Sequence, residues 1–241
     1  MTDIQFTYGW YQALLQNLQN RGYTFRSFAD DVTGGSVFLR HDVDWSPRKA
    51  VTIAELENEL GVSSTFFFLV SSPFYNVMNR EGREATKRIQ DLGHEIGLHF
   101  STHQYWDVEP ETERLNSAIH DEIAVLSTLT TDPVTSVSFH NPPEWVFRRS
   151  FEGLVSTYER RFFDAVAYRA DSNQRWRDEP PFDDGIPKTV QVLTHPVLWG
   201  ERDGWTTDRL REERDYQAQR IEDHLVETDR TWHGSRGITE P

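Results

Sequence analysis

Residues 37–47 read VFLRHDVDWSP, and this stretch predicts much of the architecture around it. Its first three residues form an apolar run that is typical of a buried strand. Ser46 and Pro47 predict the start of a helix, because serine is a favoured N-cap and proline suits the first helical position. Two aspartates, Asp42 and Asp44, therefore lie between a predicted strand and a predicted helix.

Strands and helices alternate along the rest of the chain. Apolar runs predict further strands at 64–70, 95–100, 137–139, 165–168 and 189–194, and apolar spacing predicts helices at 7–20, 47–61, 82–92, 111–129, 149–157 and 207–226. Because the strands are continuously apolar, we expect a parallel α/β sheet of six or seven strands covered by helices, either closed into a barrel or open. We divide the chain into a helical N-terminal elaboration (1–36), the barrel (37–200), and a C-terminal helix with a loose tail (201–241).

Composition narrows the classes of function. The formal net charge of -14 makes nucleic acid an unfavourable partner. The absence of cysteine excludes a Cys-ligated zinc, an iron–sulfur cluster and a cysteine nucleophile, so any metal must be held by histidine and carboxylate. The longest strongly apolar stretch, residues 66–70, is far short of the ~20 residues that span a bilayer. With no basic and apolar leader at the N-terminus, we expect a cytoplasmic protein without a membrane span.

Two short clusters carry potential metal chemistry. Asp42 and Asp44 stand at i and i+2, so in extended chain both point the same way, about 6–7 Å apart. One carboxylate is then placed to bind a metal and the other to contact its water, although a pair of acids before a helix also suits simple capping. His99 and His103 stand at i and i+4, the spacing that chelates one ion on a helical turn. Two imidazoles and one carboxylate suit Zn, Fe(II), Mn or Co.

Other polar residues also follow predicted strands. His140, Asp171 and His195 each come directly after an apolar run. In a β/α barrel the carboxyl ends of the strands converge on one mouth, so residues far apart in sequence would meet there. His195 precedes Pro196, which favours extended geometry, and a histidine in this place could protonate a leaving group or be purely structural.

Taken together, these motifs resemble the metal-dependent polysaccharide deacetylases, carbohydrate esterase family 4 of the NodB-homology superfamily. The chain is most similar to the branch whose first motif reads Arg-His-Asp-Val-Asp, and the resemblance spans residues 37–199. It implies a distorted β/α barrel, usually of seven strands. It also implies that Asp42 is the general base, and that Asp44, His99 and His103 are the metal ligands.

The resemblance further implies that His195 is the general acid and that Asp171 tunes it. The family's third motif usually begins with an arginine that pairs with the base, whereas here the matching stretch is His140-Asn141-Pro142-Pro143. Either His140 or Arg40 would then take that role. The residues expected to contact substrate are His140, Asn141, Trp176, Trp199 and Arg40, the tryptophans because aromatic faces commonly stack on sugars.

The expected activity is a metal-dependent carbohydrate deacetylase, an amidohydrolase that removes an N-acyl group of acetyl type from a sugar or glycan precursor. The expected cofactor is one divalent ion, zinc foremost, with Co, Mn, Fe or Ni as alternatives. Two other functions stay open. One is a degenerate barrel that binds metal and sugar without turnover, and the other is a hydrolase of another C–N or ester bond.

Overall fold

The computed structural model describes residues 4–236, and its centre is one parallel sheet. Seven strands follow the order β6-β5-β4-β3-β2-β8-β7, and the short β1 pairs with the first residues of β2. The strands are β1 (Thr24–Phe25), β2 (Ser36–Val43), β3 (Thr65–Phe68), β4 (Glu95–Phe100), β5 (Ser136–Phe139), β6 (Val155–Ser156), β7 (Ala167–Ala170) and β8 (Thr189–Thr194). The sheet curls into a half-barrel, and its edge strands β6 and β7 are not paired with each other within the described residues. The prediction of a distorted β/α barrel in a single domain is confirmed.

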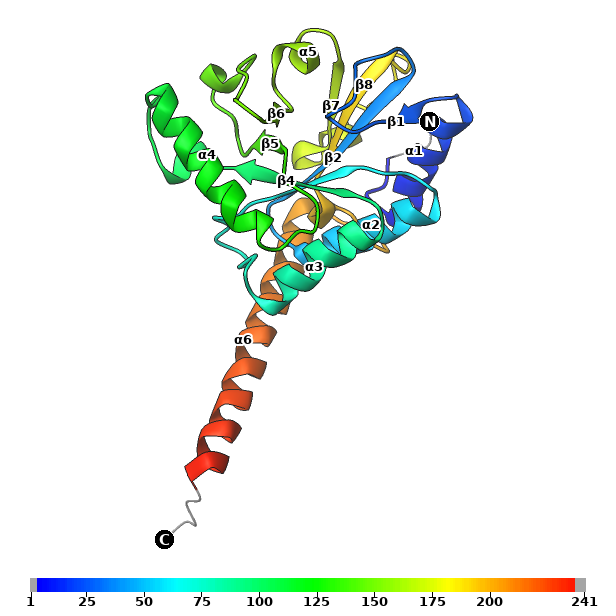
Figure 1. Ribbon diagram of the computed structural model, residues 1–241. Coiled ribbons are helices and arrows are strands. Elements are labelled where there is room, and N and C mark those ends of the chain that lie inside the picture. The colour runs from blue at the N-terminus through cyan, green and yellow to red at the C-terminus, as the bar shows by residue number, and fades with distance from the viewer. Residues whose placement is uncertain (1–3, 237–241) are drawn as a thin grey trace.

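Helices surround this sheet (Figure 1). The α-helices are α1 (Tyr8–Asn20), α2 (Pro47–Glu59), α3 (Arg80–Asp91), α4 (Thr112–Ser127), α5 (Arg160–Phe163) and α6 (Thr206–Arg236). Short 3-10 turns follow several strands: η1 (Thr102–Gln104), η2 (Glu144–Val146), η3 (Ser172–Arg177) and η4 (Pro196–Leu198). The predicted start of α2 is confirmed, because the Ser46 hydroxyl accepts from the Lys49 amide and Pro47 is the first helical residue. Within the described residues, no helix is both long enough and apolar enough to cross a membrane.

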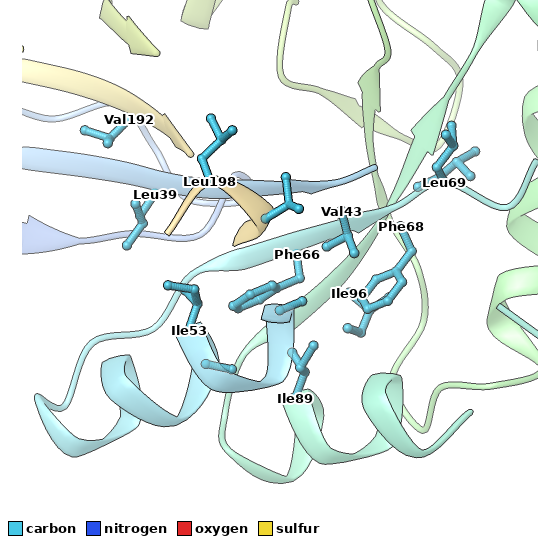
Figure 2. Close-up of a cluster of buried hydrophobic side chains, with 14 of the residues drawn as sticks. Leu39, Val43, Ile53, Phe66, Phe68, Leu69, Ile89, Ile96, Val192 and Leu198 are labelled. Atoms are coloured by element: carbon cyan, nitrogen blue, oxygen red, sulfur yellow. The ribbon is translucent and has the colours of Figure 1, made fainter. Parts of the chain in front are cut away.

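The two faces of the sheet have different cores. Figure 2 shows the outer one, where strand side chains such as Leu39 and Phe66 meet Ile53 of α2 and Ile89 of α3. The inner one is an aromatic cluster inside the curl of the sheet, made by Phe28, Phe38, Phe67, Phe162 and Val166. Because side chains alternate along a strand, β2 sends Phe38, Arg40 and Asp42 to this inner side.

Gly97 of β4 makes room for one of the inner rings. It is paired in register with Phe67, and a Cβ on it would overlap the Phe67 ring and the Ser136 hydroxyl. A side chain at this position would therefore displace the aromatic cluster below the site.

Three sequence-based predictions need correction. The stretch 149–157 is not a helix: it turns at Gly153, whose φ is +72°, and then forms β6 against β5. The predicted strand at 165–168 begins two residues later, as β7. The predicted loose tail is helical up to Arg236, because no glycine or proline interrupts the charged pattern of α6 before Gly234. Residues 237–241 of that tail lie outside the described part.

Candidate metal centre and active site

The first motif lies at the carboxyl end of the central strand. Strand β2 continues through the motif to Val43, so Asp42 points to the inner side of the sheet, as does Asp44 two residues later. Both carboxylates approach the same imidazole: His99 Nε2 lies 3.8 Å from Asp42 Oδ2 and 3.0 Å from Asp44 Oδ1. The expectation that the two aspartates point the same way agrees with this geometry.

Three residues from the carboxyl ends of β2, β4 and β5 form a candidate metal centre. Asp44, His99 and His140 each offer one ligand atom, and these atoms lie within 4.8 Å of one another. His140 Nδ1 lies 3.1 Å from Asp44 Oδ1. Burial alone would raise the pKa of Asp44, but the charge of His99 and the hydrogen bonds from His140 and His99 hold it well below its usual range. The site therefore favours an ionised carboxylate facing two imidazoles.

The hydrogen bonds of Ser138 fix how the His99 ring is oriented in this cluster. Its hydroxyl proton is donated to Asp42 Oδ1 at 3.2 Å, so the Ser138 oxygen is left to accept from His99 Nδ1 at 3.1 Å. A neutral His99 with its proton on Nδ1 would turn the lone pair of Nε2 toward the carboxylate of Asp44. Without an ion, Nε2 donates a hydrogen bond to Asp44 Oδ1 at 3.0 Å, whereas a divalent ion in place of that proton would suit the same set of N and O donors.

His103 lies outside this cluster. It is exposed on η1, and its Nε2 lies 2.9 Å from the main-chain oxygen of Asn141. Strand β4 runs through Phe100, so His99 and His103 do not share the helical turn that their spacing suggested. His103 instead contacts the loop that carries His140.

Asn141 orients the ring of His140. Its side-chain nitrogen lies 3.1 Å from His140 Nε2, and its backbone adopts a φ of +45°, which asparagine tolerates better than most residues. Rotating this amide by 180° would let it accept from Nε2 and leave Nδ1 free as a ligand atom. The hydrogen bond to Asp44 raises the pKa of His140, with burial opposing it.

Arg40 is the cationic partner of Asp42. It is fully buried, and its Nη2 donates to Asp42 Oδ2 at 3.0 Å and to the Tyr158 hydroxyl at 2.9 Å. Its Nη1 donates to Thr157 and to Gln191. The arginine absent from the third motif therefore has a structural counterpart two residues before Asp42 on the same strand.

A histidine–aspartate pair, His195 and Asp171, faces the cluster from the ends of β8 and β7. His195 Nδ1 lies 2.6 Å from Asp171 Oδ1, and its Nε2 points back toward the cluster, 3.9 Å from Asp44 Oδ2. The fully buried Asp171 also accepts from the His195 amide and from Trp199 Nε1 at 2.9 Å. Burial lowers the pKa of His195, but the charges of Asp171, Asp44 and Asp42 raise it to about 9. At neutral pH this imidazole is a charged proton donor in the metal-free protein.

The two predicted substrate tryptophans lie inside the protein. Trp176 is 1% exposed and Trp199 is fully buried, and their rings pack edge to face 6.1 Å apart. Neither offers a face to a sugar; Trp199 acts on the site through its hydrogen bond to Asp171.

Neither Ser138 nor the place of His140 in the candidate metal centre was predicted from the sequence. The signal for both was alternation along β5, because Ser136, Ser138 and His140 share one face of an extended chain. Only the pairing of β5 beside β4 shows that this face meets His99.

A buried polar network lies behind the site, on the outer side of β2. His41 Nε2 lies 2.8 Å from Glu57 Oε1 and its Nδ1 lies 2.7 Å from the hydroxyl of Thr194, the residue before His195. Glu57 also accepts from Tyr11 and from Ser64. This network ties the end of the strand that carries Asp42 to the end of the strand that leads to His195.

Comparison with protein-family models and with curated proteins finds no match. Solved structures similar to this chain include a family 4 carbohydrate esterase pseudoenzyme from Bacillus anthracis, at 18% identity and a TM-score of 0.42. That match covers 76% of this chain and 60% of the pseudoenzyme, so the chain spans about three-fifths of its length.

The matches to two further structures cover most of this chain and most of the other chain. A family 4 carbohydrate esterase from Bacillus anthracis is 17% identical, with a TM-score of 0.44, and the match covers 89% of this chain and 92% of that one. The peptidoglycan deacetylase PdaC from Bacillus subtilis is 14% identical, with a TM-score of 0.45 and coverage of 84% and 96%. The pseudoenzyme and the esterase carry the name of the family that the motifs of this chain resemble.

Proposed function

We propose that the protein is a metal-dependent amidohydrolase that removes an N-acyl group from a sugar or glycan precursor. The observation that carries the proposal is the placement of a candidate base and a candidate acid around one three-residue cluster. Asp42 lies beside His99, and His195 faces Asp44 from β8. The motif resemblance assigns the same roles to Asp42 and His195.

Asp44, His99 and His140 would hold the ion, with zinc as the foremost candidate. The chemistry that a divalent ion supplies, when bound by these residues, is Lewis-acid activation of a water and of a carbonyl oxygen. Asp42 would accept the proton of the attacking water. Its two oxygens are fixed by Arg40 and Ser138, so the carboxylate is oriented before substrate arrives.

His195 would donate a proton to the departing amine. An amine is a poor leaving group unless it is protonated, so cleavage of an amide needs such a donor. Asp171 holds the Nδ1 proton of His195 and stabilises the imidazolium, which leaves Nε2 to face the substrate.

The hydrogen bonds of Arg40 favour an enzyme over a degenerate binding barrel. The degenerate alternative rested on the missing arginine of the third motif, and a buried arginine paired with Asp42 supplies that charge from β2. Because the chain carries a net charge of -14, a neutral acylated sugar is a more favourable substrate than an anionic polymer.

The test is hydrolysis by protein loaded with zinc, cobalt or manganese. Acetate release from N-acetylglucosamine oligomers should depend on metal and stop with a chelator. Asp42→Asn and His195→Gln should lower kcat by about 10²–10⁴-fold. Retained metal binding in both variants would show that they lost chemistry and not the centre.

Matched O-acetyl and N-acetyl sugars distinguish amide from ester hydrolysis. Activity confined to the ester would replace the proposal with an esterase. Metal binding without turnover of either compound would support the degenerate barrel, and full activity of Asp42→Asn would refute the assigned base.

A further inference from the structure

A pocket of about 420 Å³ lies between the two edges of the half-barrel. Its lining comes from the segment after β6, from β7 and from β8, and its volume is in the range of pockets that bind small molecules. Apolar or aromatic residues form most of its wall, with Phe147, Phe162, Phe163 and Val166 among them.

The polar side chains in the depth of this pocket are already engaged. Thr157 and Gln191 accept from Arg40 Nη1, and the Tyr158 hydroxyl accepts from Arg40 Nη2. The amide nitrogen of Gln191 donates to the main-chain oxygen of Thr157. A sugar in the depth of this space would find few free hydrogen-bond partners, whereas a hydrocarbon group needs none; Ser172 and Arg175 supply the polar part of the lining.

The pocket borders the candidate active site along three segments. Pro142 stands two residues after His140, and Ser172 directly follows Asp171. The deep residues share Arg40 with Asp42, the candidate base. The carbon attacked in the proposed reaction lies next to Asp42, so the chain attached to that carbon is the part of a substrate that reaches this pocket.

We propose that this pocket binds the hydrocarbon chain of an N-acyl group longer than acetyl. The inference rests on the proposed amidohydrolase function and names its substrate class: sugars that carry a linear acyl chain of medium length. Each methylene that leaves water for the pocket should raise kcat/KM by on the order of fourfold.

The kinetic test compares N-acetyl-, N-butyryl-, N-hexanoyl- and N-octanoylglucosamine with metal-loaded protein. We expect kcat/KM to rise along the series. In Phe163→Arg, which places a charge at the pocket entrance, the octanoyl-to-acetyl ratio should fall at least tenfold. Phe163 is 37% exposed, so the variant is expected to fold.

Val125 provides the matched control. It is also 37% exposed but lies on α4, away from the pocket lining, so Val125→Arg should leave the ratio unchanged. A flat series, or a ratio that falls equally in both variants, would overturn the pocket assignment while leaving an amidohydrolase that acts on acetyl groups.

Calorimetry with octanoate and hexanoate separates the two proposals. Binding of octanoate to the wild type, and its loss in Phe163→Arg but not in Val125→Arg, supports the pocket even if no amide is cleaved; that outcome refutes only the proposed reaction. No octanoate binding to the wild type would refute the pocket. Equal binding of both acids would refute an extended chain site.

Discussion

Arg40 and Asp42 stand on the same face of one strand, and their side chains form a buried ion pair of 3.0 Å inside the half-barrel. The pairing is local, because residues i and i+2 of a strand are neighbours on one face. The cation is fixed by three further side chains, two after β6 and one on β8. A pair that is local to β2 therefore also ties the β6 edge of the sheet to its centre.

Replacing Arg40 should damage both stability and activity. Arg40→Met leaves the Asp42 carboxylate buried without its cation, which typically costs about 3–5 kcal/mol. Arg40→Lys keeps the charge but cannot reach the same partners with one ammonium, so it should be intermediate. Urea denaturation measures both.

The control for Arg40 is Arg88→Met, because the side chains of Arg88 and of its partner Glu55 are 51% and 45% exposed, so their ion pair lies on the surface. Its cost should be within about 1 kcal/mol. Equal stability of the Arg40→Met protein and the wild type would contradict the assigned role of the buried pair.

The metal ligands can be assigned by comparing His140 with His103. If Asp44, His99 and His140 form the centre, then His140→Ala should weaken zinc binding by at least tenfold, as should Asp44→Asn and His99→Ala. His103→Ala removes only the contact with the Asn141 carbonyl and should keep most of the affinity. Calorimetric titration with zinc measures each constant. A loss at His103 with retention at His140 would restore the ligand set implied by the family resemblance.

The sequence predicted the strand ends well and the partners across strands poorly. Alternation placed Asp42 and Asp44 on one face, because that relationship is local to the chain, and the same alternation explains why Arg40 lies beside them. Whether His103 or His140 joins the candidate metal centre depends on where β4 ends and on the pairing of β5 beside it. The spacing of the histidines in the sequence predicts neither. Trp199 was misjudged for a similar reason: nearness to a motif in sequence did not reveal that its ring packs inward.

The metal-free protein should lose stability at alkaline pH through His195. Its pKa is raised from 6.5 to about 9 in the folded state, chiefly by Asp171, with Asp44 and Asp42 adding to the effect against burial. The resulting stabilisation is fully present below pH 6.5 and is lost as the pH rises through 9. It amounts to about 3 kcal/mol at most.

Urea denaturation of chelator-treated protein at pH 6.5 and pH 9 tests this dependence. His195→Gln should be less stable than the wild type at pH 6.5 and should approach it at pH 9. His120→Gln, at an exposed position on α4, is the control. A constant difference between wild type and His195→Gln over this range would exclude the assigned shift.

Gly97→Ala should be destabilising in spite of alanine's better backbone propensity. The new methyl group would overlap the Phe67 ring, and overpacking of this kind costs about 1–3 kcal/mol. The second change Phe67→Leu shortens the side chain, so the double variant should lose less than the sum of the two single changes. A double-mutant cycle from urea denaturation measures this coupling, and simple additivity would show that Phe67 is not what excludes a side chain at Gly97.

Replacing Glu57 should destabilise the protein more than replacing an exposed acid of the same helix. It is completely buried and accepts from His41, Tyr11 and Ser64. Burial opposes its ionisation, but the charge and hydrogen bond of His41 together lower its pKa, so the carboxylate is the form the network needs. In Glu57→Gln the amide turns a donor toward groups that are donors themselves, and we expect a loss of about 3–5 kcal/mol.

The matched control for Glu57 is Glu55→Gln on the same helix, α2. The Glu55 side chain is 45% exposed and pairs with Arg88 on the surface. It should change stability by no more than about 1 kcal/mol. Because His41 also contacts Thr194, the residue before His195, Glu57→Gln should in addition lower kcat at temperatures where the variant is still folded. A variant with unchanged kcat would limit the network to a role in stability, and equal stability of the two glutamine variants would refute that role as well.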